Sequence, residues 1–234
     1  MVTAHNSLGS YSQLASEYYD SQRHPTCANF REASAAILRS WFSAFLTPGI
    51  VILETGAGAS LAAELKIEMK LPVALILSDQ SAEMLSKSDG GSSDRRVVSD
   101  AEHLAFRSRS VDAIVASLAD PYNTIAFWQE CARVLRPGGR VFFTTPSFTW
   151  AHSFREETGS PTMAAEFALA NGGTLFVPSV VLRPSSQAEL IRSAGLEVEQ
   201  VVHIDACEIQ YTKRSPKLRP GALVTGYCAA LPLL

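Results

Sequence analysis

The chain has 234 residues, of which 47% are hydrophobic and 18% are charged. This length supports one substantial hydrophobic core, so we expect a single domain over residues 1–234. The formal net charge of −3 provides no positive field to attract a phosphate backbone. The charge therefore argues against a nucleic-acid partner and favours a small-molecule substrate.

The four cysteines, at positions 27, 131, 207 and 228, are far apart and form no C-x-x-C pair. Neither a zinc cluster nor a disulfide framework is predicted, and no metal is expected. The first residues, MVTAHNSLGS, lack the pattern of a secretion signal, and no apolar run approaches the roughly 18 residues needed to span a membrane. We expect a soluble, cytoplasmic protein with reduced thiols. Its oligomeric state is left open.

Residues 1–48 are predicted to form a helical cap. Apolar side chains recur every three or four positions between Tyr11 and Phe45, as is typical of helices, with an interruption at His24-Pro25. After Pro48-Gly49, the apolar run Ile50–Leu53 predicts the first buried parallel strand.

Strands and helices then alternate through the segment 49–146, the predicted cofactor-binding core. Further strands are predicted over Val73–Leu77, Val97-Val98, Val111–Ala116 and Arg140–Thr144, and helices over Ala59–Met69, Ser81–Lys87 and Thr124–Leu135. The sequence GGSSD at 90–94 predicts a polar insertion, and RPGG at 136–139 predicts the turn that closes a helix. This alternation is typical of an α/β fold with a doubly wound, mostly parallel sheet.

After the core, residues 147–186 predict an irregular insertion that covers the substrate, because they combine aromatic residues with a Gly172-Gly173 turn and two prolines. Residues 187–234 are predicted to complete the sheet. We expect a helix over Gln187–Ala194, a strand over Leu196–His203 and, after the polar connection KRSPKLRPG, a last strand over Ala222–Ala230.

The first predicted strand runs directly into the sequence ETGAG at 54–58. Two glycines at the carboxyl edge of a parallel sheet allow a ligand to approach the backbone. Amides at a helix N-terminus attract a carboxylate, whereas Glu54 suits an ammonium group, and the methionine end of S-adenosylmethionine carries both. A simple tight turn also explains the glycines.

Acidic residues end the next two predicted strands as well. Asp79 lies roughly 20 residues beyond the glycines, where a carboxylate can bind both ribose hydroxyls or can cap the helix that begins at Ser81. At the end of the third strand, Asp100 can accept a hydrogen bond from the exocyclic amine of adenine, and Ala101 offers a backbone amide. The three strand ends together predict an adenosine-containing ligand.

Five segments resemble, in order, the motifs of the ubiquinone-biosynthesis-type class I S-adenosylmethionine-dependent methyltransferases, the methyltransferase type 11 family: VILETGAGAS, LILSDQSAEML, VVSDAEHLAF, VDAIVAS and ECARVLRPGGRVFFTTPS. The resemblance covers roughly residues 50 to 147. It implies a seven-stranded Rossmann-like sheet with an antiparallel last strand, S-adenosylmethionine as cofactor and S-adenosylhomocysteine as product. The cofactor-binding residues predicted on this basis and from the strand ends are Tyr19, Glu54, Thr55, Gly56, Ala57, Gly58, Asp79, Gln80, Met84, Asp100, Ala101, Glu102 and Ser117.

Two positions depart from the family pattern. Ser60 replaces a usual third glycine, which is a mild change because serine can open a helix. The segment Leu118–Asn123 replaces a longer loop and is weakly similar to the D-P-P-Y signature of amino-group methyltransferases. In that signature the acidic residue orients a planar amine and the aromatic ring stacks on it. A simple Asp-Pro turn is the alternative.

Methyl transfer requires alignment of the acceptor, and a base only if the acceptor carries a proton. The residues before the first strand and after the fifth are rich in aromatic side chains, with one histidine near each group. Candidate bases are His24, Asp120 and His152, and candidate substrate contacts are Tyr122, Trp150 and Phe154. The ring of Tyr19 is a candidate neighbour of the sulfonium. Surface or packing roles are the alternative for all of these side chains.

The sequence therefore predicts methyl transfer from S-adenosylmethionine to an oxygen or nitrogen of a small molecule such as a secondary metabolite. One alternative is an NAD(P)-dependent dehydrogenase, although Leu61 occupies the position of the third glycine of its G-x-G-x-x-G motif. Another is a non-catalytic module that binds the cofactor and docks on a partner enzyme.

Overall fold

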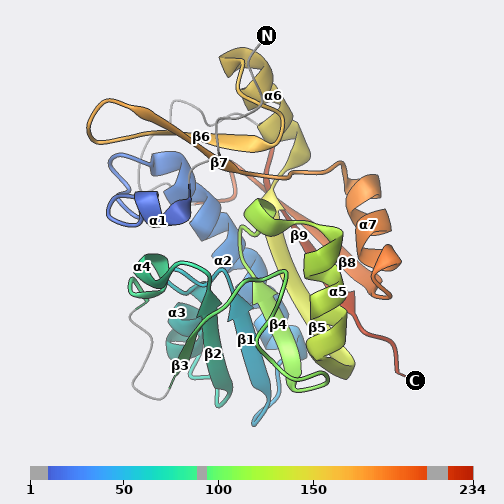
Figure 1. The fold of residues 1–234 in the computed structure, drawn as a ribbon. Helices are drawn as coiled ribbons and strands as arrows, with labels where there is room; N and C mark the ends of the chain where they lie inside the picture. Colours follow the sequence, from blue (N-terminus) through green and yellow to red (C-terminus); the bar gives the residue numbers. More distant parts are fainter. Residues whose placement is uncertain (1–9, 89–93, 210–220, 234) are drawn as a thin grey trace.

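The computed structural model describes residues 10–88, 94–209 and 221–233, which are built around one large sheet (Figure 1). Its strands are β1 (Val51–Thr55), β2 (Ala74–Asp79), β3 (Arg95–Val98), β4 (Val111–Ala116), β5 (Leu135–Pro146), β8 (Glu197–Asp205) and β9 (Ala222–Ala230). The order is β3-β2-β1-β4-β5-β9-β8, and β9 is antiparallel to both of its neighbours. The predicted α/β fold with a seven-stranded, mostly parallel sheet is confirmed.

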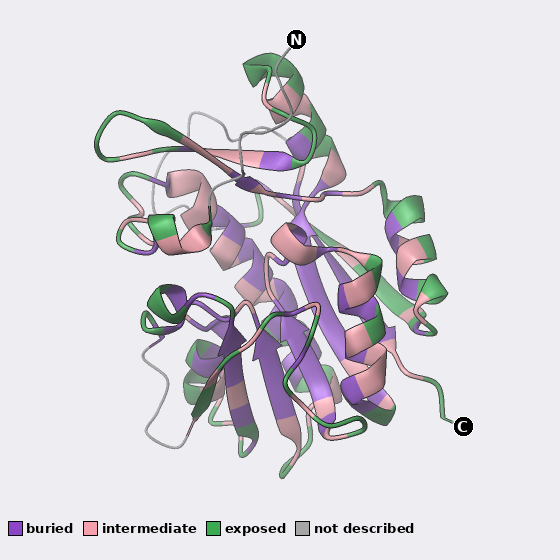
Figure 2. Cartoon of the chain, viewed as in Figure 1, coloured by how far each residue is buried: buried purple, intermediate pink, exposed green. Residues whose placement is uncertain are grey.

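Helices cover both faces of the sheet. On one face lie α2 (Pro25–Phe45) and α3 (Leu61–Glu68), and on the other lie α5 (Ile125–Val134) and α7 (Pro184–Ser193). Successive side chains of β5 point to opposite faces, so Phe142 packs against Trp41 of α2 and Phe143 packs against Trp128 of α5. Figure 2 shows the strands buried at the centre and the outer faces of the helices exposed.

Most predicted elements of the core are present with boundaries shifted by a few residues. The interruption at His24-Pro25 is confirmed, because α2 begins at Pro25 and, within residues 10–24, the short helix α1 (Tyr11–Leu14) is the only α-helix before it. The helix predicted over Ser81–Lys87 is the short α4 (Ala82–Leu85). A 3-10 turn, η1 (Asp120–Tyr122), follows β4.

The predicted turn at 136–139 is wrong, because β5 begins at Leu135, directly after α5, and these residues belong to the strand. Leu135 pairs with Val111 of β4. The amide of Gly138 donates to the carbonyl of Leu231, and the amide of Leu231 donates to the carbonyl of Gly139. These hydrogen bonds hold the segment within β5 as an irregularity of the strand, with Gly138 at a φ angle of +78° and a shift of register against β4 between Leu135 and Arg140.

The prediction of an irregular insertion after Pro146 is also wrong. The segment forms helix α6 (Phe148–Thr158) and an antiparallel hairpin of β6 (Ala164–Ala168) and β7 (Thr174–Pro178), with the predicted glycine turn between the strands. The hairpin lies above the carboxyl ends of the parallel strands, beside α1 (Figure 1). Phe167 and Val177 of the hairpin pack against Leu14 of α1, so the hairpin contacts the N-terminal segment.

Three sequence predictions fall on residues outside the described ranges. These are the polar insertion at 90–94, of which only Asp94 is described, the connection KRSPKLRPG up to Pro220, and the N-terminal segment up to Gly9. Among the described residues, no helix is long and apolar enough to cross a membrane.

Candidate functional site

A cleft lies at the carboxyl ends of the central parallel strands, beneath the N-terminal segment. Predicted cofactor residues that line it are Tyr19, Glu54, Gly56, Ala57, Asp79, Gln80, Met84, Asp100, Ala101 and Ser117. Thr55, Gly58 and Glu102 are not among the lining residues. The residues that the sequence did not assign to this cleft are Tyr11, Tyr18, Arg31, Leu61, Ser99, Leu118, Pro121 and Tyr122. We call this space the cofactor cleft.

The glycine loop adopts a backbone conformation that favours glycine. Gly56 and Gly58 have φ angles of +59° and +46°. A Cβ atom on Gly58 would lie 2.0 Å from the hydroxyl oxygen of Tyr19, and one on Gly56 would lie 2.4 Å from that of Tyr122. Both glycines therefore admit a tyrosine hydroxyl close to the backbone.

Asp79 connects the glycine loop to the start of α4. Its Oδ2 accepts a hydrogen bond from the amide of Gly58 at 3.0 Å, and its Oδ1 accepts one from the amide of Ser81 at 2.9 Å. The N-cap of α4 is Ser81 itself, whose hydroxyl accepts from the amide of Met84. Burial raises the pKa of Asp79. Its carboxylate thus lines the cofactor cleft in a position fixed by two backbone amides.

Glu54 is buried at the base of the cofactor cleft and stabilises the first turn of α3. Its carboxylate accepts hydrogen bonds from the hydroxyl of Ser60 and the amide of Ala62. Burial raises its pKa to about 7. Ser60 is the N-cap of α3 and accepts from the amide of Ala63, which confirms that serine opens this helix in place of the family's glycine.

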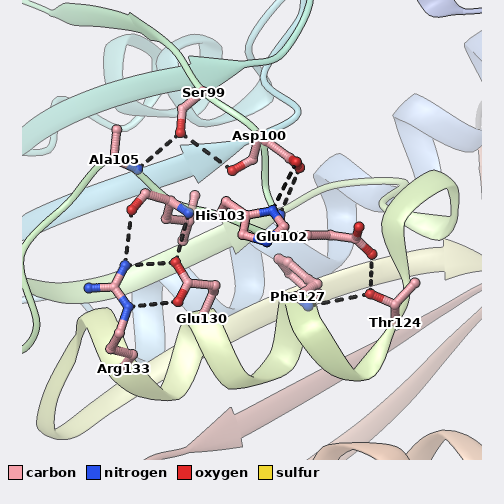
Figure 3. A network of polar contacts seen from close by, with 10 residues as sticks. Ser99, Asp100, Glu102, His103, Ala105, Thr124, Phe127, Glu130 and Arg133 are labelled. Atoms are coloured by element: carbon pink, nitrogen blue, oxygen red, sulfur yellow. Dashed lines mark hydrogen bonds and ion pairs between the residues drawn. The ribbon is translucent and has the colours of Figure 1, made fainter.

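The segment predicted to hold adenine follows β3 and is tied to α5 (Figure 3). Asp100 accepts a hydrogen bond from the amide of Glu102 at 2.9 Å. The carboxylate of Glu102 accepts from the hydroxyl of Thr124, at the start of α5. Glu102 therefore points away from the cofactor cleft and anchors the segment.

Two further residues of α5 hold the same segment from below. Arg133 donates to the carbonyls of Leu104 and Phe106 at 2.9 and 2.8 Å. Glu130 accepts from the amide of Leu104 at 2.7 Å and also binds Arg133 (Figure 3). The position of Asp100 and Ala101 is thus determined by side chains of a helix that follows them by some distance in sequence.

A second cavity of about 450 Å³, the acceptor chamber, lies between α2, α6 and β6. It shares Tyr11, Tyr18 and Leu118 with the cofactor cleft. Aromatic side chains form much of its wall, and the rings of Trp150 and Phe154 lie parallel, with centroids 5.2 Å apart and planes inclined by 8°. The wall of the chamber therefore combines aromatic rings with polar side chains such as Asp120 and Arg155.

The structure separates the predicted catalytic and substrate residues into three groups. His24, Asp120, Trp150 and Phe154 line the acceptor chamber. Tyr122 lines the cofactor cleft instead, and its hydroxyl donates to the carbonyl of Thr55 at 2.8 Å. His152 lines neither cavity; its side chain is 44% exposed and lies 3.4 Å from a carboxylate oxygen of Glu156.

Asp120 is the buried carboxylate of the acceptor chamber. Its Oδ2 accepts a hydrogen bond from the hydroxyl of Ser179 at 2.5 Å. Burial raises its pKa to about 6. Arg155 donates to both the carbonyl and the hydroxyl oxygen of Ser179 at 2.9 Å. The sequence pointed to Asp120 and to the region of Arg155 but not to Ser179, which lies more than 50 residues further along the chain than Asp120.

The cofactor cleft suits an adenosine ligand with an amino-acid end. Carboxylates stand at the ends of β1 and β2 and just after β3, next to the backbone of the glycine loop. The hydroxyl of Ser117 lines the cleft, is buried and has no hydrogen-bond partner in the described part of the chain, so it is available to a ligand. Among the described residues, no group of three metal-binding side chains is found.

Residues 53–143 match the family model described as a methyltransferase domain. No curated protein matches the sequence at a significant level.

Solved structures match the fold. A chain of the complex between the Haloferax volcanii Trm112 methyltransferase activator and a proposed methyltransferase is 16% identical, with a TM-score of 0.70 over 95% of this chain and 97% of that one. An S-adenosylmethionine-dependent methyltransferase from Methanosarcina mazei is also 16% identical, with a TM-score of 0.64 over 82% and 97%. The Burkholderia thailandensis 1,6-didemethyltoxoflavin-N1-methyltransferase, bound to 1,6-didemethyltoxoflavin and S-adenosylhomocysteine, is 17% identical, with a TM-score of 0.56 over 94% and 86%.

The family match and the strand order agree with the motifs in the sequence and decide against the dehydrogenase alternative. The described strand order β3-β2-β1-β4-β5-β9-β8, with β9 antiparallel, is that of the class I methyltransferase fold. Residues 53–143 therefore form a methyltransferase domain, in a chain that has the fold of S-adenosylmethionine-dependent methyltransferases.

Proposed function

We propose that the enzyme transfers the methyl group to an oxygen or nitrogen of a small molecule bound in the acceptor chamber. The observation that carries this proposal is that the chamber and the cofactor cleft share Tyr11, Tyr18 and Leu118 as a common boundary. An acceptor in the chamber would lie beside the methyl group at this boundary, and alignment of the two reactants is the main requirement of methyl transfer.

The same proposal assigns the cofactor-binding residues. The glycine loop would hold the methionine portion, Asp79 the ribose, and Asp100 with Ala101 the adenine, with Tyr19 beside the methionine side. When bound, S-adenosylmethionine supplies an electrophilic methyl group on a sulfonium. The Burkholderia relative supports a small acceptor, since it is a methyltransferase solved with a small heterocyclic compound in addition to S-adenosylhomocysteine.

The walls of the acceptor chamber suit a flat, largely apolar acceptor. The rings of Phe30 and Trp150 lie edge to face with their centroids 4.7 Å apart, and the rings of Trp150 and Phe154 are stacked. Residues of the N-terminal segment and of β6 form part of the chamber wall, which would help to exclude water during transfer.

The test is an assay of S-adenosylhomocysteine formation by the purified protein with separate sets of phenols, N-heteroaromatics, alkylamines, carboxylic acids, transfer RNA and proteins. The proposal expects turnover with small molecules. For whichever small molecule is methylated, Trp150→Ala should raise its KM about tenfold and leave the affinity for S-adenosylmethionine unchanged. The proposal would be overturned if only transfer RNA or protein were methylated, or if no acceptor were methylated at all.

A further inference from the structure

Asp120 lies on the short turn that separates the two cavities. The residues of η1 divide between the two cavities, since Asp120 lines the acceptor chamber whereas Pro121 and Tyr122 line the cofactor cleft. Leu118, two residues earlier, lines both. Its φ angle of +50° is unusual for a leucine, and its amide donates to the hydroxyl oxygen of Thr144 at 2.9 Å. The turn therefore holds a carboxylate near the place where donor and acceptor meet.

The partners of Asp120 fix its orientation and balance its charge. Ser179, which follows β7, donates to Asp120, and Arg155 of α6 donates to Ser179. The charge of Arg155 lowers the pKa of Asp120. The charge of Asp120 in turn raises the pKa of Tyr11 and of Tyr18. Burial raises the pKa of both tyrosines well above the usual value, so they stay neutral near pH 7. Arg155 is thus the group of opposite charge that acts on Asp120, and Arg23, His24 and Glu166 also line the chamber.

The aromatic wall completes a three-part arrangement. Trp150 and Phe154 lie on α6, the helix that also carries Arg155, and they line the same chamber as Asp120. A flat ring stacked on this wall would present its edge to other residues of the chamber, and a donor group on that edge would complement the carboxylate.

We propose that Asp120, held by Ser179 and Arg155, is the general base for a neutral planar aromatic acceptor that carries an aryl O–H or ring N–H group. This inference rests on the proposed function and narrows its substrate class. A neutral acceptor is favoured over a cationic one because the positive charge of Arg155, which acts on Asp120, would repel a second cation beside it.

A lone pair of the acceptor oxygen or nitrogen forms the new bond to the methyl carbon, and the carbon–sulfur bond breaks with its electron pair remaining on sulfur, which gives S-adenosylhomocysteine. The acceptor's O–H or N–H bond breaks, its electrons stay on the acceptor, and its proton moves to Asp120. Asp120 must therefore be ionised at the start of each turnover.

The first test measures binding rather than turnover. In the presence of S-adenosylhomocysteine, 1-naphthol and benzimidazole are titrated against the wild type and Asp120→Asn, together with 1-methoxynaphthalene, which lacks the donor hydrogen. Asp120→Asn should weaken 1-naphthol and benzimidazole about tenfold and leave 1-methoxynaphthalene unchanged. Trp150→Ala should weaken all three. Failure of both donor compounds to bind, or equal affinity for the wild type and Asp120→Asn, would overturn the inference.

The second test uses the acceptor found in the methylation assay. Asp120→Asn should lower kcat by roughly 10²- to 10⁴-fold with an unchanged affinity for S-adenosylmethionine. In the wild type, kcat should fall below about pH 6, where Asp120 becomes protonated, and this fall should be absent in the variant. Glu197→Gln, at the exposed start of β8, is the matched control and should stay within about twofold of the wild type.

Ser179 is a positioning residue in this scheme. Its hydrogen bond lowers the pKa of Asp120, so Ser179→Ala should move the acidic limb of kcat to higher pH, and Ser179→Thr should restore it. Turnover of alkylamines alone, or of an aromatic acceptor with Asp120→Asn within about threefold of the wild type, would reject the inference and leave the proposed function intact. Absence of turnover with every small molecule would instead reject the proposed function.

Discussion

The hydroxyl oxygen of Tyr19 lies 2.0 Å from the position that a Cβ atom on Gly58 would occupy, and it accepts a hydrogen bond from the amide of Ala59 at 2.8 Å. The N-terminal segment is thereby attached directly to the glycine loop. The guanidinium of Arg31 lies over the ring of Tyr19 at 5.1 Å and donates to the carbonyl of Ala59, which strengthens the same attachment.

Gly58→Ala should therefore weaken S-adenosylmethionine binding by at least about tenfold, because it combines a positive φ with the clash against Tyr19. Tyr19→Phe removes the clashing oxygen and leaves the nearest ring carbon 3.3 Å from the new Cβ. In the double variant the affinity should recover in part, with a coupling energy of about 1 kcal/mol or more. Calorimetric titration of S-adenosylmethionine into the wild type, the two single variants and the double variant measures this coupling energy. Purely additive losses of affinity would disprove the contact between Tyr19 and Gly58.

Arg133→Met should loosen the segment that carries Asp100 and Ala101, since the arginine holds the carbonyls of Leu104 and Phe106. We expect cofactor affinity to fall about threefold to tenfold and the free energy of unfolding to fall by about 1–2 kcal/mol. The control is Arg136→Met, whose arginine pairs with Asp112 and does not line the cofactor cleft. An equal effect of both variants on affinity would show that α5 does not position the adenine segment.

Much of the cofactor cleft was predictable from the sequence, because parallel strands bring their carboxyl ends to one edge of the sheet. Glu54, Asp79 and Asp100 could be placed together from strand periodicity alone. The contact between Tyr19 and Gly58 could not, since it joins residues on different elements through side-chain packing. The approach of Arg155 and Ser179 to Asp120 could not be predicted either. It depends on α6 and β7, and the sequence had predicted an irregular segment in their place.

The buried carboxyl of Glu54 should make the ligand-free protein sensitive to pH. Burial raises its pKa from 4.5 to about 7, so its contribution to stability is fully present below about pH 4.5 and is lost as the pH rises through 7.

This loss amounts to roughly 3 kcal/mol at most. Glu54→Gln cannot ionise, so the drop in the free energy of unfolding between about pH 5 and about pH 8 should be smaller in the variant by about 1–3 kcal/mol. Denaturant titrations at the two pH values test this. Asp120 titrates in the same range in both proteins, so the difference between them isolates Glu54. An identical drop in both proteins would contradict the role assigned to its burial.

We expect the cofactor cleft to bind S-adenosylmethionine and Asp79 to hold its ribose. Calorimetric titration of the wild type and Asp79→Ala with S-adenosylmethionine, S-adenosylhomocysteine and NAD tests both expectations. The wild type should bind the first two ligands and not NAD, and Asp79→Ala should lose at least about tenfold in affinity while it remains folded. Equal affinity of the two proteins for S-adenosylmethionine, or binding of NAD alone, would contradict them.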